Sequence, residues 1–120
     1  MIKKIEVISI PVKNQDKAVE FYINKLGFKL LVDTPFDQNK RWIQIGLSDE
    51  NETTISLVDW FEDMLPGHVK GLVLSVDDIE KTVKNLKENG VGISPIDETP
   101  WGKFAHFNDI DGNGWTIREE

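Results

Sequence analysis

Acidic and amide side chains near the end of the sequence follow the spacing of a calcium-binding loop. The expression D-x-[DN]-x-[DN]-G-x5-E is matched by Asp109, Asp111, Asn113, Gly114 and Glu120. Oxygen ligands at that spacing hold Ca²⁺ in an EF-hand, where a helix lies on each side of the loop. The flanking residues 104–108 and 114–119 instead have the pattern of strands. We therefore predict a tight hairpin, in which Asp, Asn and Gly tolerate the unusual turn angles.

The two histidines are the other candidates for acid-base or metal chemistry. His106 lies in a predicted strand, whereas His68 lies in a predicted exposed linker. The chain has no cysteine, which excludes disulfides, thiolate metal sites and cysteine nucleophiles. It also lacks a G-x-S-x-G motif, a P-loop and a dinucleotide-binding fingerprint. His106 is therefore either a hydrogen-bonded strand residue or a ligand contact, because the sequence offers no acidic residue beside it to orient a general base.

Bulk composition narrows the possible partners. With 14 basic and 21 acidic residues, the net charge is −7, which repels a nucleic-acid backbone and favours cationic guests. No apolar stretch approaches the roughly 20 residues that span a bilayer. The N-terminus has neither the long apolar core nor the cleavage site of a secretory signal. We expect no nucleic-acid or membrane partner, and a single soluble cytoplasmic domain over residues 1–120.

The first half of the chain predicts one strand, one helix and three further strands. Alternating apolar residues predict the first strand over residues 5–12. Asn14 or Asp16 can cap a helix of about ten residues, which Gly27 ends in the left-handed conformation. The predicted turn before the last strand is Ser48–Asn51. The three strands after the helix are predicted over residues 29–32, 41–47 and 53–58. A loop containing Pro and Asp separates the first of these three strands from the second.

The second half repeats this order, which indicates an internal duplication. A strand over residues 69–76 leads into a helix that runs from near Asp78 to Gly90. A shift of 64 residues lays Val12 on Val76, at matching places in the two units. Short strands follow around Ile93 and over residues 102–108 and 114–119. We therefore predict two βαβββ units, over about residues 1–62 and 67–120.

Two motifs carry a resemblance to a known family. They are V-K-N-Q-D-K-A-V-E-F-Y-I-N-K-L-G-F early in the chain and P-W-G-K-F-A-H-F-N-D-I-D-G-N late, where Ile110 replaces a usual proline. Over essentially its whole length the chain resembles the vicinal-oxygen-chelate superfamily, which includes glyoxalases, bleomycin-resistance proteins and extradiol dioxygenases. The resemblance implies an α+β fold, in which the two units form a curled mixed sheet around one cavity with the helices outside.

The resemblance also implies where a metal would be held. Enzymes of this superfamily generally bind one divalent ion through His, Glu or Gln side chains on four strands. The corresponding positions here are Val7, Ser56, Gly71 and Thr116. Valine and glycine offer no ligating side chain, and neutral hydroxyls are poor substitutes for imidazole and carboxylate. We therefore expect no metal and no other cofactor, which argues against metal-dependent catalysis.

These ligand-equivalent positions also fix which face of each strand looks into the cavity. On that face we expect aromatic walls and a few polar orienting groups, as in many small-molecule sites. The candidate ligand-binding residues are Trp42, Gln44, Ser56, Phe104, His106 and Arg118. Each has a purely structural alternative. The tryptophans could fill the core or a dimer interface, with Trp115 assigned to the core, and Arg118 could pair with Glu119 or Glu120.

Three functions remain open at this point. The first is a bleomycin-resistance-like protein that binds a small aromatic or cationic molecule in the cavity without a catalytic metal. The second is a metal-dependent lyase, isomerase or dioxygenase of the same superfamily. The third is an accessory domain that docks a partner through an apolar cluster of Trp60, Phe61, Met64 and Leu65. We also predict a homodimer, because the superfamily often pairs subunits and open sheet edges are otherwise exposed.

Overall fold

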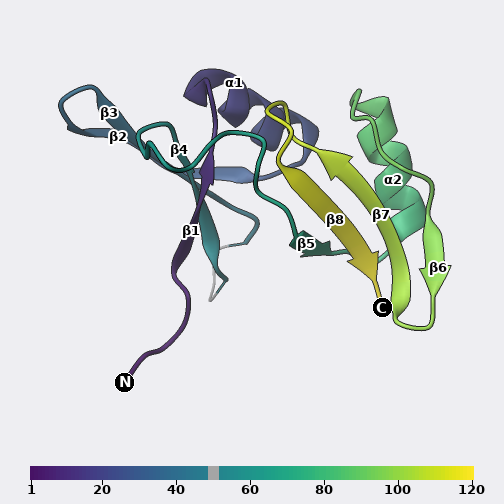
Figure 1. Ribbon diagram of the computed structural model, residues 1–120. Helices are drawn as coiled ribbons and strands as arrows, with labels where there is room; N and C mark the ends of the chain where they lie inside the picture. The colour runs from purple at the N-terminus through teal and green to yellow at the C-terminus, as the bar shows by residue number, and fades with distance from the viewer. Residues whose placement is uncertain (49–51) are drawn as a thin grey trace. The chain divides into compact units, whose positions relative to one another are not determined.

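Each half of the chain folds as a strand, a helix and three further strands. The computed structural model describes residues 1–48 and 52–120 and divides into two compact units, Met1–Pro66 and Gly67–Glu120. Each unit holds one four-stranded mixed sheet and a helical segment, which confirms the α+β fold with two βαβββ units (Figure 1). Among the described residues, no helix has the length and apolar character needed to cross a membrane.

Unit 1 forms a sheet with strand order β1-β4-β3-β2. Strand β1 pairs with β4 in parallel, and the remaining pairs are antiparallel. The elements in chain order are β1 (Val7–Pro11), α1 (Gln15–Glu20), a π-helical turn η1 (Phe21–Lys25), β2 (Lys29–Asp37), β3 (Lys40–Gly46) and β4 (Thr54–Val58). Strands β1 and β2 are therefore the two edges of this sheet.

Helix α1 is fixed to the sheet by its cap and its first residue. Asn14 is the cap, since its side chain accepts a hydrogen bond from the Lys17 N–H. The buried Gln15 amide donates to the carbonyls of Arg41 and Leu57 at 2.8 and 2.9 Å. The helical segment ends at Gly27, which has a φ of +86°, as the sequence predicted. These contacts hold the helix against one face of β3 and β4.

The loop predicted after residue 32 is wrong. Strand β2 continues to Asp37, and β3 begins at Lys40 after a turn at Asn39, which has a φ of +62°. Pro35 was read as a strand breaker, but β2 is an edge strand, where a residue without an N–H is tolerated. The turn predicted at Ser48–Asn51 falls largely on residues 49–51, outside the described residues.

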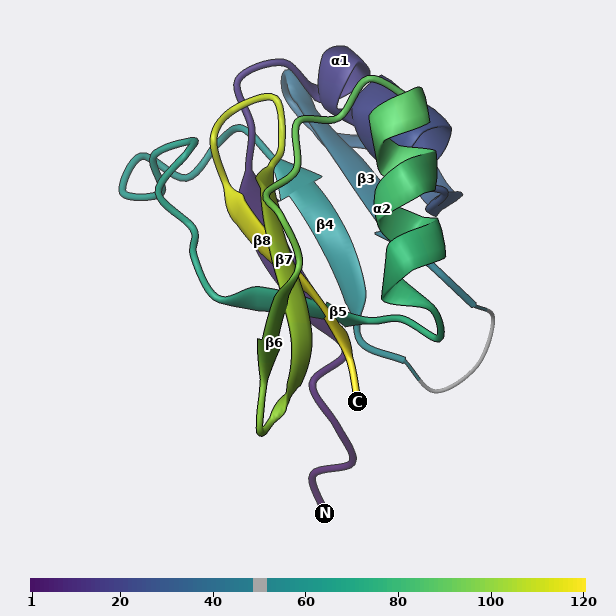
Figure 2. The same cartoon turned by 90° about the vertical axis from the view of Figure 1, so that its right-hand side faces the viewer.

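Unit 2 repeats this topology with strand order β5-β8-β7-β6, in which β5 and β8 are parallel. Its elements are β5 (Leu72–Ser75), α2 (Ile79–Glu88), β6 (Asp97–Thr99), β7 (Gly102–Asn108) and β8 (Gly114–Glu119). Figure 2 shows α2 running alongside β7. Strands β7 and β8 have the predicted bounds, whereas β5 is shorter than predicted. Ile93 forms only an isolated bridge to Phe107, and the strand lies at β6 instead.

Buried residues alternate along β3, β7 and β8, as the period-2 pattern predicted, whereas Ser56, Leu57 and Val58 of β4 are buried in a row. In unit 1, Ile43 and Ile45 of β3 are fully buried. In unit 2, Phe107 and Trp115 are buried and their rings stack at 6.4 Å between centroids, which confirms the assignment of Trp115 to the core. The other face of each sheet is left for the residues between these positions, and the candidate site residues lie there.

The loop between β7 and β8 is the predicted hairpin and not an EF-hand, because strands flank it on both sides. The Asp109 carboxylate accepts hydrogen bonds from the backbone N–H groups of Asp111 and Asn113. The Asn113 side-chain oxygen accepts from the backbone N–H groups of Gly67 and Val69. Asp109 and Asn113 thus join the hairpin to the segment that precedes β5.

Candidate functional site

Cross-strand register brings three of the predicted site residues onto one face of the unit 1 sheet. Gln44 of β3 lies opposite Ser56 of β4, and Ser56 lies opposite Ser9 of β1. Trp42 precedes Gln44 by two residues, so its side chain leaves the sheet on the same face. Trp42, Gln44 and Ser56 therefore share one face of unit 1, opposite to the buried Ile43 and Ile45.

A chain of hydrogen bonds runs along this face. The Trp42 Nε1–H donates to Gln44 Oε1 at 3.0 Å, and Gln44 Nε2 donates to Thr54 Oγ1 at 2.8 Å. The Thr54 hydroxyl donates in turn to the Glu6 carbonyl at 3.1 Å. The Gln44 amide is thus held at both ends, and we refer to these bonds as the Trp42–Gln44–Thr54 relay.

Ser56 stands beside the relay with its hydrogen-bonding capacity unused. Its side chain is fully buried, and its hydroxyl has no hydrogen-bond partner among the described residues. Leaving a buried hydroxyl unpaired costs roughly 1–3 kcal/mol in mutational data. Such a group is an exception in a folded protein, and in a site it is a candidate to pair with a ligand.

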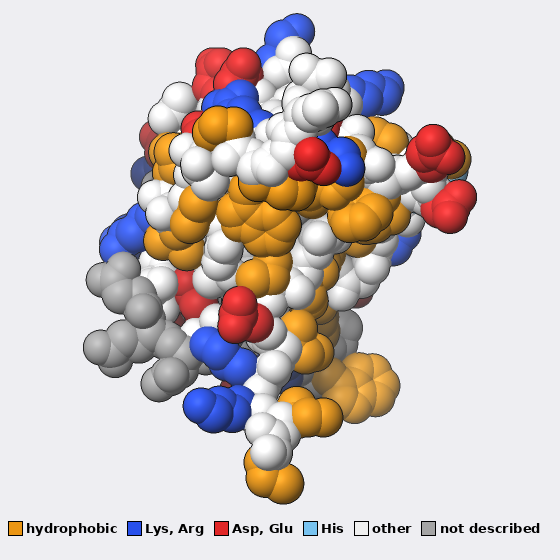
Figure 3. Space-filling model, turned by 90° about the vertical axis from the view of Figure 1, so that its left-hand side faces the viewer, with side chains coloured by type: hydrophobic (Ala, Val, Ile, Leu, Met, Phe, Trp, Pro, Cys, Tyr) orange, Lys and Arg blue, Asp and Glu red, His pale blue; other side chains and the backbone are white. Residues whose placement is uncertain are grey.

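Four aromatic rings contact one another at one end of this face. Phe36 lies 6.1 Å from Trp42 and 5.0 Å from Trp60, measured between ring centroids. Trp60 lies 6.3 Å from Trp42 and 5.8 Å from Phe61. Phe36 and Phe61 are 47% and 49% exposed, so the group, which we call the aromatic cluster, reaches the surface. Figure 3 shows hydrophobic side chains gathered in a broad patch on the side where Figure 1 labels β2 and β3.

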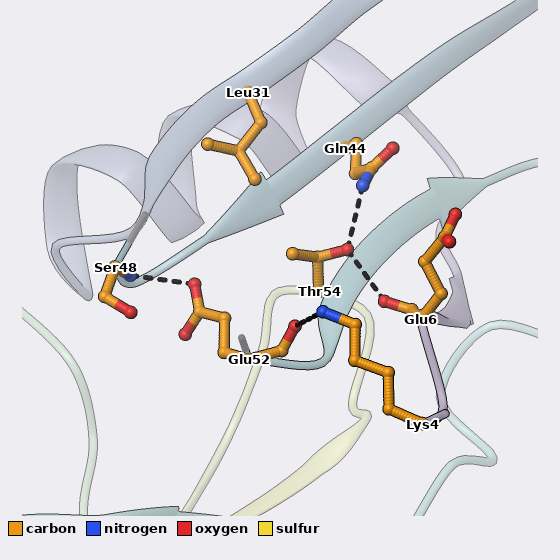
Figure 4. Close-up of a pocket in the computed structure, with 7 residues that line it drawn as sticks. All are labelled: Lys4, Glu6, Leu31, Gln44, Ser48, Glu52 and Thr54. Carbon is orange, nitrogen blue, oxygen red and sulfur yellow. Dashed lines mark hydrogen bonds between the residues drawn. The ribbon is translucent and has the colours of Figure 1, made fainter. Parts of the chain in front are cut away.

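A pocket of about 330 Å³ adjoins the relay at Gln44 and Thr54 (Figure 4). One wall is apolar, and the rest is polar or charged. The Glu52 carboxylate at one end accepts hydrogen bonds from the backbone N–H groups of Leu47 and Ser48. We call this the polar pocket; its lining residues are Lys4, Glu6, Leu31, Gln44, Ser48, Glu52 and Thr54. Gln44 belongs to both the pocket and the relay, so it connects the pocket to the aromatic cluster.

Unit 2 brings the other three predicted site residues together on one face of its own sheet. Phe104 lies opposite Arg118, and His106 lies opposite Thr116. The His106 Nδ1 atom is 2.8 Å from the Thr116 hydroxyl. Arg118 donates twice to the Trp101 carbonyl, at 3.1 and 2.7 Å, and its guanidinium lies 5.9 Å from the Phe104 ring centroid. Within the chain, these contacts orient Arg118.

Unit 2 also holds a group of three carboxylates whose oxygens lie within 4.8 Å of one another, on Asp78, Glu80 and Glu119. The fold accounts for each of them. Asp78 caps α2, and Glu119 accepts from the backbone N–H of Ile79. Glu80 accepts from Lys103 at 3.1 Å, and this bond lowers the pKa of Glu80. The group therefore gives no independent indication of a metal site.

A model of the glyoxalase, bleomycin resistance protein and dioxygenase superfamily matches residues 4–117. The chain belongs to this family. Among solved structures, TnmS3, an antibiotic-binding protein from Streptomyces sp. CB03234, is 39% identical, with a TM-score of 0.91, over 98% of this chain and 96% of that chain. A superfamily member from Sphaerobacter thermophilus DSM 20745 is 34% identical, with a TM-score of 0.90, over 99% and 98% of the two chains. The uncharacterized protein YurT of Bacillus subtilis (strain 168) is 35% identical over 92% of this chain and 94% of its own length.

The positions at which metal-dependent members of the superfamily hold their ion do not fit one here. Val7 has no ligating atom, and Gly71 precedes β5 with a φ of +83° and no side chain. The register pairs Ser56 with Ser9 and Gln44, and Thr116 with Val73 and His106. The Gln44 amide is already bonded to Trp42 and Thr54. Thr116 is already bonded to His106. Two hydroxyls and no carboxylate or imidazole at the four ligand positions are a poor donor set for a divalent ion.

Sequence reasoning missed two parts of this arrangement. Phe36 was placed in the loop predicted after residue 32, so its face was not assigned. Trp60 was grouped only with the apolar residues that follow it in the sequence. Its ring also contacts Phe36 and Trp42, which come earlier in the sequence. The relay also depends on Thr54, whose partner could be named only once the register of β3 on β4 was known.

Proposed function

We propose that this chain binds a small aromatic or cationic molecule on the cavity face of its sheets, without a catalytic metal. The observation that carries the proposal is the direct hydrogen bond between Trp42 of the aromatic cluster and Gln44 of the polar pocket. Exposed rings can stack on a planar guest, while a small number of fixed polar groups beside them set its orientation. Ser56 lies on the same face, but its hydroxyl is fully buried, so a ligand can pair with it only if the covering side chains move.

The relatives support the same class of function. TnmS3, which is 39% identical, is described as an antibiotic-binding protein. The net charge of −7 raises the local concentration of cations and leaves cationic guests within the proposal. A metal-dependent reaction is not favoured, because the residues at the superfamily's ligand positions are Val7, Ser56, Gly71 and Thr116.

The unit 2 residues are proposed as additional ligand contacts. Phe104 offers a ring face, and Arg118 and His106 offer donors beside it. Arg118 is held by the Trp101 carbonyl, so its guanidinium is already positioned in the unbound protein. A positioned side chain loses less conformational entropy when a ligand binds, which favours affinity.

A thermal-shift and fluorescence screen tests the proposal. The panel contains planar aromatic compounds and aliphatic amines, each measured with EDTA and with added Zn²⁺ or Mn²⁺. A ligand present at about 100 times its dissociation constant adds roughly 2.7 kcal/mol to the folded state, which raises the melting temperature by several degrees. We expect aromatic compounds to stabilise the protein equally under both metal conditions. Stabilisation that requires a metal, or none by any aromatic compound, contradicts the proposal.

We also propose that the protein is a cytoplasmic homodimer. Both sheets are open, with β1 and β2 at the edges in unit 1 and β5 and β6 in unit 2. Exposed apolar side chains lie on these edges, including Ile8 of β1 and Val73 of β5. Open edges and exposed apolar residues are commonly covered by a second subunit. Sedimentation at several concentrations should give about twice the 13.7 kDa chain mass, and a monomer at every concentration excludes the dimer.

A further inference from the structure

The direction of the Gln44 amide is fixed by its neighbours. An indole N–H can only donate, so the atom of Gln44 that faces Trp42 must be the side-chain oxygen. The amide nitrogen then faces Thr54, whose hydroxyl accepts from Gln44 and donates to the Glu6 carbonyl. Reversing the amide would set an N–H against the Trp42 N–H. The relay therefore has one favourable direction, from Trp42 toward Glu6.

This direction turns the donor side of Gln44 toward the polar pocket. Figure 4 shows the amide nitrogen of Gln44 on the side of Thr54, with both residues lining the pocket. The nitrogen carries two hydrogens, and the bond to Thr54 uses one of them. Gln44 is half-buried and lines the pocket, and the described residues offer its nitrogen no second acceptor. On the side of the polar pocket, Gln44 thus presents a hydrogen-bond donor.

Two other pocket residues, Glu52 and Lys4, agree with a donor in this pocket. Glu52, which could attract a cation, holds the backbone N–H groups of Leu47 and Ser48 through one carboxylate oxygen. The Lys4 ammonium also lines the pocket, with a single long contact of 3.4 Å to the Glu52 carbonyl. Lys4 therefore adds a second donor with spare hydrogens.

We propose that the ligand is a planar aromatic molecule that carries a neutral oxygen acceptor, such as a ring carbonyl, at the edge facing Gln44. This inference rests on the proposed function and narrows it. The rings of the ligand stack on those of the aromatic cluster. The carbonyl oxygen of the ligand accepts a hydrogen bond from the second N–H of the Gln44 amide. A ligand whose facing edge carries only hydrogen-bond donors places a donor against the Gln44 N–H. That N–H is then left without an acceptor, so such a ligand binds more weakly.

Two probes of nearly the same shape separate these cases. Acridone presents a carbonyl at the edge of its central ring, and 9-aminoacridinium presents an amino donor at the same place. Dissociation constants are measured by calorimetry at about 0.5 M salt, where a Debye length of roughly 4 Å screens the general attraction of the acidic protein for a cation. We expect acridone to bind at least about tenfold more tightly to the wild-type protein.

The variant Gln44→Glu should reverse this preference. Glutamate has nearly the same shape, and its carboxylate can accept from both Trp42 and Thr54, so the fold should be retained. It offers no donor to a carbonyl and attracts a cation, which should lower acridone affinity and raise 9-aminoacridinium affinity. The variant Gln44→Met removes both roles and should bring the two affinities together. It provides the same test if Gln44→Glu does not fold, which its melting curve reveals.

The outcomes separate this inference from the proposed function. If neither probe binds the wild-type protein and the wider aromatic panel also fails, the proposed function falls and this inference falls with it. If both probes bind but the wild-type protein prefers 9-aminoacridinium, or binds the two equally, aromatic binding stands and the acceptor rule is wrong. The same conclusion follows if the ratio of the two dissociation constants is unchanged in a folded Gln44→Glu or Gln44→Met protein.

Discussion

The indole N–H of Trp42 donates to the side-chain oxygen of Gln44 at 3.0 Å, on the face of the unit 1 sheet opposite to its core. One aromatic residue thus belongs to a ring cluster and also sets the direction of the neighbouring amide. Loss of its N–H should affect affinity and selectivity together. Loss of ring area alone should affect affinity only.

Trp42→Phe tests this dual role. The variant keeps a ring beside Phe36 and Trp60 but removes the N–H that holds Gln44, so we expect ligand affinity to fall by about 1–2 kcal/mol. The tryptophan fluorescence response to ligand should be smaller but still present, because Trp60 remains in the cluster. Trp101→Phe is the matched control, since Trp101 is highly exposed in unit 2 and its contact with Arg118 uses the backbone carbonyl. Equal binding by both variants would contradict the role of Trp42.

The sequence predicted which face of a sheet a residue occupies wherever strand alternation was clear, although only Gln44 of the six candidate residues lines the polar pocket. Strands β7 and β8 have their predicted bounds because alternating residues end there at a turn rich in Asp, Asn and Gly. Trp42 and Gln44 were placed on the correct face relative to Ile43 and Ile45. Phe36 was missed because Pro35 marks a loop in most contexts, and only the sheet order reveals that β2 is an edge strand.

The hydrogen-bond partners within the site could not be predicted from the alternation of residues along the strands. Alternation states which face a residue occupies, but not which residue on the next strand it meets. The contact between Gln44 and Thr54 depends on the register of β3 on β4, and the hold of Arg118 on Trp101 depends on the turn between β6 and β7. Both are tertiary relationships between residues that are not adjacent in sequence.

The contribution of unit 2 to binding can be measured with His106→Ala and Arg118→Ala. If these residues contact the ligand, removal of either leaves a ligand group without its partner, and affinity should fall by about 1–3 kcal/mol. Lys103→Ala is a control on the same strand as His106, because Lys103 points to the helix side and bonds Glu80. Wild-type affinity in both test variants would restrict the site to unit 1.

The hairpin between β7 and β8 should depend strongly on Asn113. Its side chain is fully buried, accepts two backbone hydrogen bonds and donates to Asp109 at 2.9 Å. Asn113→Ala leaves these buried groups unpaired, so we expect a loss of about 2–4 kcal/mol in the free energy of unfolding. Asn108→Ala, at an exposed position of the same hairpin, should change it by less than about 0.5 kcal/mol. Urea unfolding measures both, and similar effects of the two variants would refute the role of Asn113.

The ion pair between Arg41 and Asp33 should make stability depend on acid pH. Hydrogen bonds from Arg41 at 2.7 and 2.8 Å hold the pKa of Asp33 below its ordinary value. The pair therefore stabilises the fold above the unfolded-state pKa of about 3.9, and this stabilisation is lost as the pH falls through the lower, folded-state pKa. Because the pair is partly exposed, Asp33→Asn should cost only about 0.5–1 kcal/mol at pH 7.

Urea unfolding of the wild type and Asp33→Asn at about pH 7 and about pH 2.5 checks this sign. The difference between the two proteins should shrink at the lower pH, because the unfolded chain gains its proton on Asp33 before the folded chain does as the pH falls. A difference that stays constant, or grows as the pH falls, would show that the charge of Asp33 contributes nothing.

The most direct test of metal-independent aromatic binding is calorimetric titration of acridone and 9-aminoacridinium into the protein in EDTA. The comparison includes wild type, Phe36→Ala with Trp60→Ala, and Trp101→Ala as the exposed-aromatic control. We predict that at least one probe binds the wild-type protein and the control with about one site per chain. Removal of Phe36 and Trp60 should weaken that binding at least tenfold while the protein stays folded. Binding that appears only after a divalent metal is added, or that is unchanged without Phe36 and Trp60, would contradict the account.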